Sequence, residues 1–147
     1  MSQARTNARK SAVQAIYQWQ MTGQNLNDIE NQFLQEDRLK NAQRSYFTEL
    51  FHGIPRDLDI IDQAMAEFVD RPIEKIDPVE RAVLRVSVYE LLNKLNVPCK
   101  VIINEGINLA RCFGAEGSHK FINGVLDKVA LQKRKSEMRA KKPASQE

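Results

Sequence analysis

The sequence predicts an all-α fold of about seven helices in two packed helical subdomains, with the boundary near residues 52–77. Apolar residues recur three and four positions apart along most of the chain, which is the spacing of one face of a helix. No segment shows convincing period-two alternation of apolar and polar residues, as a strand would. Glycine and proline stand mostly between the apolar stretches, where helices end. The length fits one domain, which we expect over residues 1–133.

The N-terminal third predicts three helices. The first spans about residues 6–21, and a shorter amphipathic helix follows around residues 29–34. The third carries a strongly apolar stripe over residues 46–51. Gly53 is expected to stop it, and Pro55 to prevent its continuation.

Two helices are predicted in the middle of the chain. The fourth covers residues 58–68 and should end before Pro72. Asp77 and Pro78 form a good start for the fifth, because an Asp side chain accepts amide hydrogens and Pro lacks one at a position where it would be unpaired. Residues 79–91 are the most hydrophobic run, which predicts a central helix.

The sixth and seventh helices follow the same logic. Pro98 opens the sixth, whose apolar face covers residues 102–113, and Gly114 ends it. Ser118 precedes the seventh, whose apolar face covers residues 121–129. After it we expect a basic flexible tail over residues 134–147.

The formal net charge of +3 is unevenly distributed. Residues 1–10 hold three cations and no anion, and residues 133–147 hold six Lys and Arg against Glu137 and Glu147, which leaves residues 11–132 at −4. Basic ends on an acidic body favour a polyanionic partner, with plain solubilising ends as the alternative.

Several classes of protein are excluded by composition. No apolar run approaches the ~20 residues of a membrane span, and the polar start lacks the apolar core of a signal peptide. Two cysteines are too few to indicate a disulfide framework. We therefore expect a cytoplasmic protein without membrane association.

Motifs for catalysis or cofactor binding are absent. The six glycines form no phosphate-binding motif. Cys99, Cys112, His52 and His119 lack the close pairing of structural zinc sites, although spacing alone leaves a Cys–His nucleophile open. Glu105, inside an apolar run, is interpreted as a polar contact at a helix surface or between helices. We expect no enzyme activity, no metal and no cofactor.

Cations on helix faces suggest contacts with nucleic acid. Arg5, Arg9 and Lys10 can neutralise phosphates along the first helix. Arg81 and Arg85 are four residues apart and so share one face of the central helix, with a solvated, ion-paired face as the alternative.

The start of the seventh helix is a second candidate. Ser118 and Lys120 lie where free amide hydrogens and the helix dipole favour a phosphate. Phe121 can stack on an unpaired base, or it belongs to the core, as its helical spacing with Val125 indicates.

Several stretches taken together resemble the NusB family of bacterial transcription antitermination factors. They are ARKSAVQAIY (8–17), VERAVLRVSVYEL (79–91), VP through INE (97–105), FG (113–114) and SHKFINGVLDK (118–128). The resemblance covers about residues 4–130 and implies a non-enzymatic, all-helical RNA-binding protein. It further implies that this protein pairs with NusE, a small ribosomal-subunit protein, and binds the boxA element of nascent RNA. Such an assembly joins RNA polymerase with other Nus factors and suppresses premature termination, notably in ribosomal RNA operons.

The resemblance also implies roles for particular residues. Tyr17 and Glu80 match positions that the family offers to NusE. Thr6 and Asn7 stand where many members carry arginine, so RNA binding at this end is expected to be weaker, or compensated by the basic tail. Members of part of the family form homodimers. The residues implied to contact RNA are Arg5, Arg9, Lys10, Phe68, Arg71, Arg81, Arg85, Ser118, Lys120 and Phe121.

Two other functions stay open at this point. One is the NusB-like RNA-recognition module that certain ribosomal RNA cytosine methyltransferases carry before a catalytic domain. That function would need a Rossmann-like region with a cofactor-binding glycine motif, which the 147 residues lack. The other is a helical protein-interaction module without an RNA role.

Overall fold

A computed structural model describes residues 2–140. The fold of these residues is all-α, as predicted, and it contains no strand. A 3-10 turn, η1 (Ile73–Lys75), precedes the central helix. The eight helices are α1 (Gln3–Thr22), α2 (Leu26–Gln35), α3 (Arg44–Arg56), α4 (Leu58–Ala66), α5 (Pro78–Asn93), α6 (Cys99–Phe113), α7 (Ser118–Lys133) and α8 (Lys135–Ala140).

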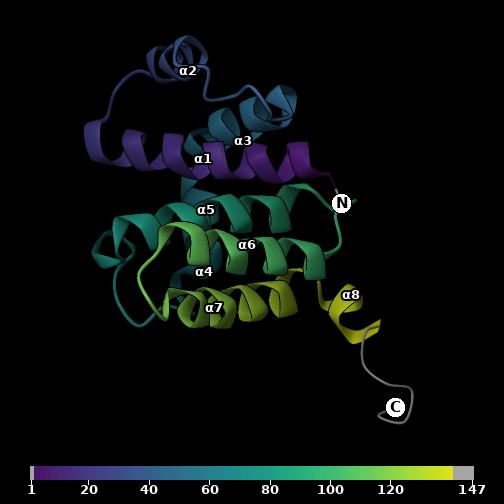
Figure 1. The fold of residues 1–147 in the computed structure, drawn as a ribbon. Coiled ribbons are helices and arrows are strands. Elements are labelled where there is room, and N and C mark those ends of the chain that lie inside the picture. Colours follow the sequence, from purple (N-terminus) through teal and green to yellow (C-terminus); the bar gives the residue numbers. More distant parts are fainter. Residues whose placement is uncertain (1, 141–147) are drawn as a thin grey trace.

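The helices form two groups around one core. Figure 1 shows α2 and α3 on one side of α1, and α5, α6 and α7 on the other. The chain passes from the first group to the second at Asp57, within residues 52–77. The two groups are not separate bodies, because buried apolar residues of α1 to α7 form one continuous cluster.

Helix α5 is the central helix, as its hydrophobic sequence predicts. The Asp77 carboxylate accepts the amide hydrogens of Val79 and Glu80, and Pro78 occupies the first turn. Every residue from Ala82 to Leu91 is buried. The helix packs against α1, α3, α4, α6 and α7, so it positions the surfaces on both sides of the molecule.

A buried ionic cluster joins α1 to α5, α6 and α3. The Arg9 guanidinium on α1 donates two hydrogen bonds to the Glu90 carboxylate, both 2.8 Å, and one to Glu105, 2.7 Å. The Tyr46 hydroxyl donates to Glu90, and the Thr6 hydroxyl donates to Glu105. Glu105 thus makes an inter-helix polar contact, one of the two interpretations drawn from the sequence.

Helix α3 does not stop at Gly53, so that expectation was wrong. A Cβ at Gly53 would lie 2.6 Å from the Tyr89 ring of α5, so the glycine here permits close helix packing and does not end the helix. The helix passes Pro55 and ends at Arg56, and the Asp57 amide still donates to the Gly53 carbonyl, 2.9 Å. A proline in the last turn removes only one hydrogen bond of the helix.

The predicted flexible tail is wrong for residues 134–140. Arg134 is 6% exposed, and α8 follows it. The Glu137 carboxylate accepts the Cys99 amide hydrogen at the start of α6, 2.6 Å. The Arg134 guanidinium donates to the carbonyls of Glu90, Leu91, Lys94 and Val97. These contacts tie α8 to the α5–α6 connection, and the remainder of the predicted tail lies outside the described residues.

Among residues 2–140, no helix combines the length and the apolarity needed to cross a membrane.

Candidate nucleic-acid interface

Arg5 and Lys10 lie half-buried along α1. The Arg5 guanidinium sits 4.4 Å from the centroid of the Tyr46 ring and donates to the Gln43 side chain, 3.4 Å. Lys10 forms no ion pair with any residue in the described range 2–140. Both side chains keep their charge near solvent, where a phosphate can approach.

Arg9 does not lie on this surface, and the structure contradicts a phosphate contact for it. Its side chain is 1% exposed and held by Glu90 and Glu105. Burial by itself lowers the pKa of this guanidinium, but the hydrogen bond and charge of Glu90 outweigh it and raise the pKa. The sequence carried a signal for this position, since Arg9 lies three and four residues before the buried Ala12 and Val13.

Arg81 and Arg85 share one face of α5, but they have different environments. Arg85 is 8% exposed and forms a bidentate ion pair with Asp62 of α4, with distances of 3.1 and 2.9 Å, and donates to Gln20 of α1. Arg85 therefore links three helices and is not a free phosphate ligand. It is ion-paired, as the alternative stated, but buried and not solvated.

Arg81 is only half-buried and donates to the Glu74 carbonyl, 3.1 Å. Its Nε is buried, and no described residue accepts a hydrogen bond from it. Burial and the charge of Arg85 lower the pKa of Arg81. Arg81 thus keeps part of its side chain accessible in the first turn of α5, although its Nε is enclosed.

A second basic and aromatic cluster lies where α7 begins. The Arg71 guanidinium is placed 5.1 Å from the centroid of the Phe121 ring, and it also pairs with Asp70. Lys120, which precedes Phe121 in the sequence, is exposed. Phe121 and Phe68 are partly buried against the core, so each ring both packs and keeps an accessible part. The structure thus brings Arg71 and Phe121 together.

Ser118 has a different environment from the one expected. It is 4% exposed, and its hydroxyl donates to the Glu80 carboxylate at the start of α5. Gly117, with a φ of 84°, is the residue that caps α7. A residue expected to contact RNA and one expected to contact the partner protein therefore bind each other, and this contact joins α7 to α5.

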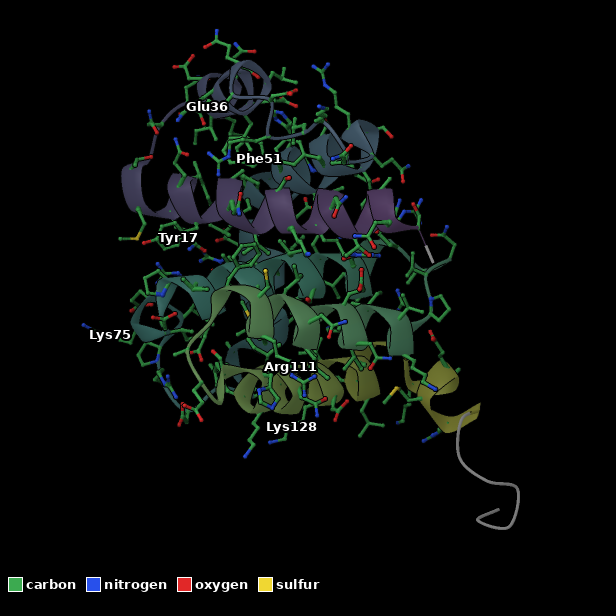
Figure 2. All side chains as sticks on the ribbon, viewed as in Figure 1. Tyr17, Glu36, Phe51, Lys75, Arg111 and Lys128 are labelled. Carbon is green, nitrogen blue, oxygen red and sulfur yellow. The ribbon has the colours of Figure 1, made fainter. Side chains whose placement is uncertain are left out.

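Tyr17 lies beside an apolar groove between α1 and the ends of α5 and α6. Tyr17 is 39% exposed and Met21 is 55% exposed, and Figure 2 shows Tyr17 on the side of α1 that faces the lower helices. The groove has a volume of about 470 Å³ and includes Val79 and Phe113 in its lining. An exposed apolar surface with an aromatic residue is typical of protein–protein contacts. Helical spacing alone does not separate these groove residues from the core.

The described residues hold no group of three or more His, Cys, Asp or Glu placed to bind a metal ion. Cys99 is buried and Cys112 is exposed, and neither forms a disulfide.

Together, the fold and these surfaces define a class: single-domain, all-helical binding proteins that carry cations, accessible aromatic rings and an apolar groove on helix faces. Comparison with known proteins identifies the member of that class. The NusB family model matches residues 6–131, so this chain belongs to the NusB family of transcription antitermination proteins.

Curated relatives agree over most of the chain. It is 48% identical over 141 residues to a transcription antitermination protein NusB from Pseudomonas savastanoi pv. phaseolicola, an alignment that covers 96% of this chain and 86% of the relative. It is 51% identical over 131 residues to the NusB protein of Edwardsiella ictaluri, covering 89% and 94%. These relatives are named as antitermination factors and not as enzymes.

Solved structures share the fold. NusB of T. maritima superposes with a TM-score of 0.77 at 29% identity, covering 95% of this chain and 99% of that one. A structure of antitermination factors NusB and NusE in complex with dsRNA gives a TM-score of 0.79 at 26% identity, covering 88% and 97%.

Proposed function

We propose that this protein pairs with NusE and binds boxA-type single-stranded RNA, and that the complex joins RNA polymerase with other Nus factors to suppress premature termination, notably in ribosomal RNA operons. The observation that carries the proposal is the similarity to a structure in which NusB, NusE and RNA are bound together. We expect the protein to act in the cytoplasm, and the family resemblance leaves both a monomer and a homodimer open for the free protein.

The accessible cations support an RNA role. Arg5 and Lys10 on α1, and Arg71 and Lys120 near the start of α7, are not enclosed in the core. Phosphate contacts from such side chains provide salt-dependent affinity without sequence preference. Arg81, half-buried in the first turn of α5, adds a further, partly accessible cation.

Recognition of single-stranded bases requires rings or amides that can reach an unstacked base. Phe121 and Phe68 keep part of each ring accessible. The Arg71 guanidinium over Phe121 fixes one face of that ring, and a base stacked nearby would also meet a cation. This arrangement favours a splayed strand over a regular duplex, although the RNA in the similar complex is double-stranded.

The groove beside Tyr17 supports the partner role. A protein bound there would cover Tyr17 and Met21 and would contact Val79, which precedes Glu80 in the first turn of α5. The same bound partner would offer additional RNA contacts, so the complex should hold one RNA strand more tightly than the isolated protein does, by an effective-concentration effect.

A gel-shift titration tests the proposal. Labelled boxA-type RNA is titrated with the full chain, with and without NusE, at low salt. We expect weak binding by the protein alone and clearly tighter binding when NusE is present. Absence of RNA binding in both titrations would refute the proposed function.

A further inference from the structure

A basic concavity lies between α1 and the loop that joins α2 to α3. It includes Lys10, one of the residues implied by the family resemblance, while its loop residues are not among them. Its volume is about 420 Å³, and three cations line it: Lys10 on α1, and Arg38 and Lys40 on the loop. Asp37 is the one carboxylate in its lining. We use the name "loop concavity" for this site, which carries a net positive charge.

The backbone turn at the end of α2 positions Arg38. Asp37 adopts a left-handed conformation, with a φ of 58°. The Asp37 amide donates to the Leu34 carbonyl, and the Arg38 amide donates to the Phe33 carbonyl, 3.1 and 2.9 Å. This pair of hydrogen bonds is a Schellman motif, which reverses the chain and leaves Arg38 above the last turn of the helix. The turn follows Glu36, which Figure 2 labels at the top of the molecule.

The Arg38 side chain is already fixed in the absence of a ligand. Its guanidinium lies 3.8 Å from the centroid of the Phe33 ring, and it donates to the Gln14 side chain of α1, 2.9 Å. Its ion pair with Glu36, 3.3 Å, is exposed and so contributes little. A cation held in place before binding loses less conformational freedom when it meets an anion.

Lys10 and Lys40 supply the remaining positive charge. Neither forms an ion pair within residues 2–140, and Lys40 is exposed. Asn7 donates its side-chain amide to the Asn41 carbonyl, 3.0 Å, which ties the loop to α1 beside these lysines. Unpaired lysines next to amide side chains suit a nucleic-acid strand, because lysines contact phosphates and amides contact base edges.

We propose that the loop concavity binds a segment of the RNA strand, with Arg38 and Lys40 contacting its phosphates together with Lys10. The inference rests on the proposed function and extends it to residues of the α2–α3 loop. These cations stand close to Asn7, a position where many family members carry arginine. Gln14 and Arg38 line both the loop concavity and the Tyr17 groove, so RNA bound here would run alongside the partner protein.

Two substitutions with opposite effects on charge test the inference. Lys40→Gln removes an exposed cation. Asp37→Asn replaces the carboxylate with an amide, on a residue that tolerates the left-handed backbone. Lys133→Gln, on the exposed end of α7, is the matched control. The dissociation constant of a boxA RNA with native flanking nucleotides is measured in the presence of NusE across a salt series, and thermal melting verifies that each variant is folded.

We expect Lys40→Gln to weaken RNA binding about five- to tenfold at roughly 50 mM salt and to reduce the salt slope by about 0.7, the contribution of one single-strand phosphate contact. Asp37→Asn should strengthen binding, and Lys133→Gln should change nothing.

If the wild-type chain binds RNA and Lys40→Gln behaves like Lys133→Gln, the inference fails while the proposed function stands. If the wild-type chain binds no RNA, both fail. Lys40→Gln could instead lower the affinity for NusE, measured in the absence of RNA, and leave the affinity for RNA unchanged. That result would assign the concavity to the partner protein and overturn the inference.

Discussion

At the scale of single residues, neighbouring positions on α1 have opposite roles. Arg9 and Lys10 are adjacent in the sequence, yet Arg9 is enclosed by two glutamates and Lys10 faces the loop concavity. Residue type alone therefore does not separate a buried cation from an accessible one. Helical phase does, because Arg9 lies on the buried stripe of α1 and Lys10 lies beside it.

Alanine substitution should separate these two roles. Arg9→Ala leaves Glu90 and Glu105 buried without their counterion, and we expect it to cost about 3–5 kcal/mol of unfolding free energy, since a broken buried ion pair leaves an uncompensated charge. Lys10→Ala should leave stability nearly unchanged and reduce the salt slope of RNA binding by about 0.7. Urea unfolding and a salt series of gel shifts measure the two effects. The reverse pattern would contradict the assignment of Arg9 to the core.

At the scale of helices, the sequence predicted seven helices close to where they occur. Caps and periodicity are local properties, so the start of α5 at Asp77 and Pro78 was predictable. The continuation of α3 through Gly53 was not, because it depends on the Tyr89 ring of another helix. The helical segment after Arg134 was not predicted, for the same reason. The Arg134 side chain that precedes it binds the Glu90 and Leu91 carbonyls, which are distant in the sequence.

The hydrogen bonds from Arg134 to four backbone carbonyls give a prediction for the segment between α7 and α8. Arg134→Ala should destabilise the protein by about 2–4 kcal/mol, because four carbonyls at the end of α5 and the following loop lose a charged donor. Lys135→Ala, at an exposed neighbouring position, is the control and should have little effect. Chemical denaturation measures both variants. Equal stability of the two would show that Arg134 does not hold the α5–α6 connection.

The contact between α2 and α3 gives a pH prediction. Burial of Glu30 by itself raises its pKa, but hydrogen bonds from His52, 2.9 Å, and Thr48, 2.8 Å, outweigh burial and lower the pKa below its usual 4.5. A carboxyl group with a lowered folded-state pKa stabilises the fold above its unfolded pKa, and that stabilisation is lost as the pH falls through the folded value. The stability of the wild-type chain should therefore fall below about pH 4.5 more steeply than that of Glu30→Gln. Identical acid profiles in thermal melts would contradict this.

At the scale of the whole molecule, the candidate binding surfaces are distributed around one continuous core. The basic edge of α1, the loop concavity and the Tyr17 groove adjoin one another, while Arg71 and Phe121 form a separate cluster at the start of α7. Family resemblance predicted many of these residues. It did not predict the loop cations, which belong to no quoted motif and become part of a site only when α2 turns back onto α1.

The separation of surfaces predicts separable binding defects. Tyr17→Ala should weaken NusE binding by about tenfold, because it truncates an accessible aromatic residue of the groove. RNA binding by the isolated protein should stay unchanged. Ile60→Ala, an exposed apolar residue on α4, is the control. Calorimetric titration with NusE and a gel shift without it provide the two measurements, and a parallel loss in both would show that Tyr17 does not act through the partner alone.

The enclosed cluster of Arg9, Glu90 and Glu105 has a consequence for how relatives of this protein diverge. Its members come from three helices, and Arg9 forms ion pairs with both carboxylates. Replacing any one of the three therefore deprives a buried charged group of an ion-pair partner. Evolution can replace these three residues by a different set only through a less stable intermediate protein or through simultaneous substitutions. We therefore expect the three positions to covary across the family, while Lys10, which forms no ion pair within residues 2–140, changes independently of them.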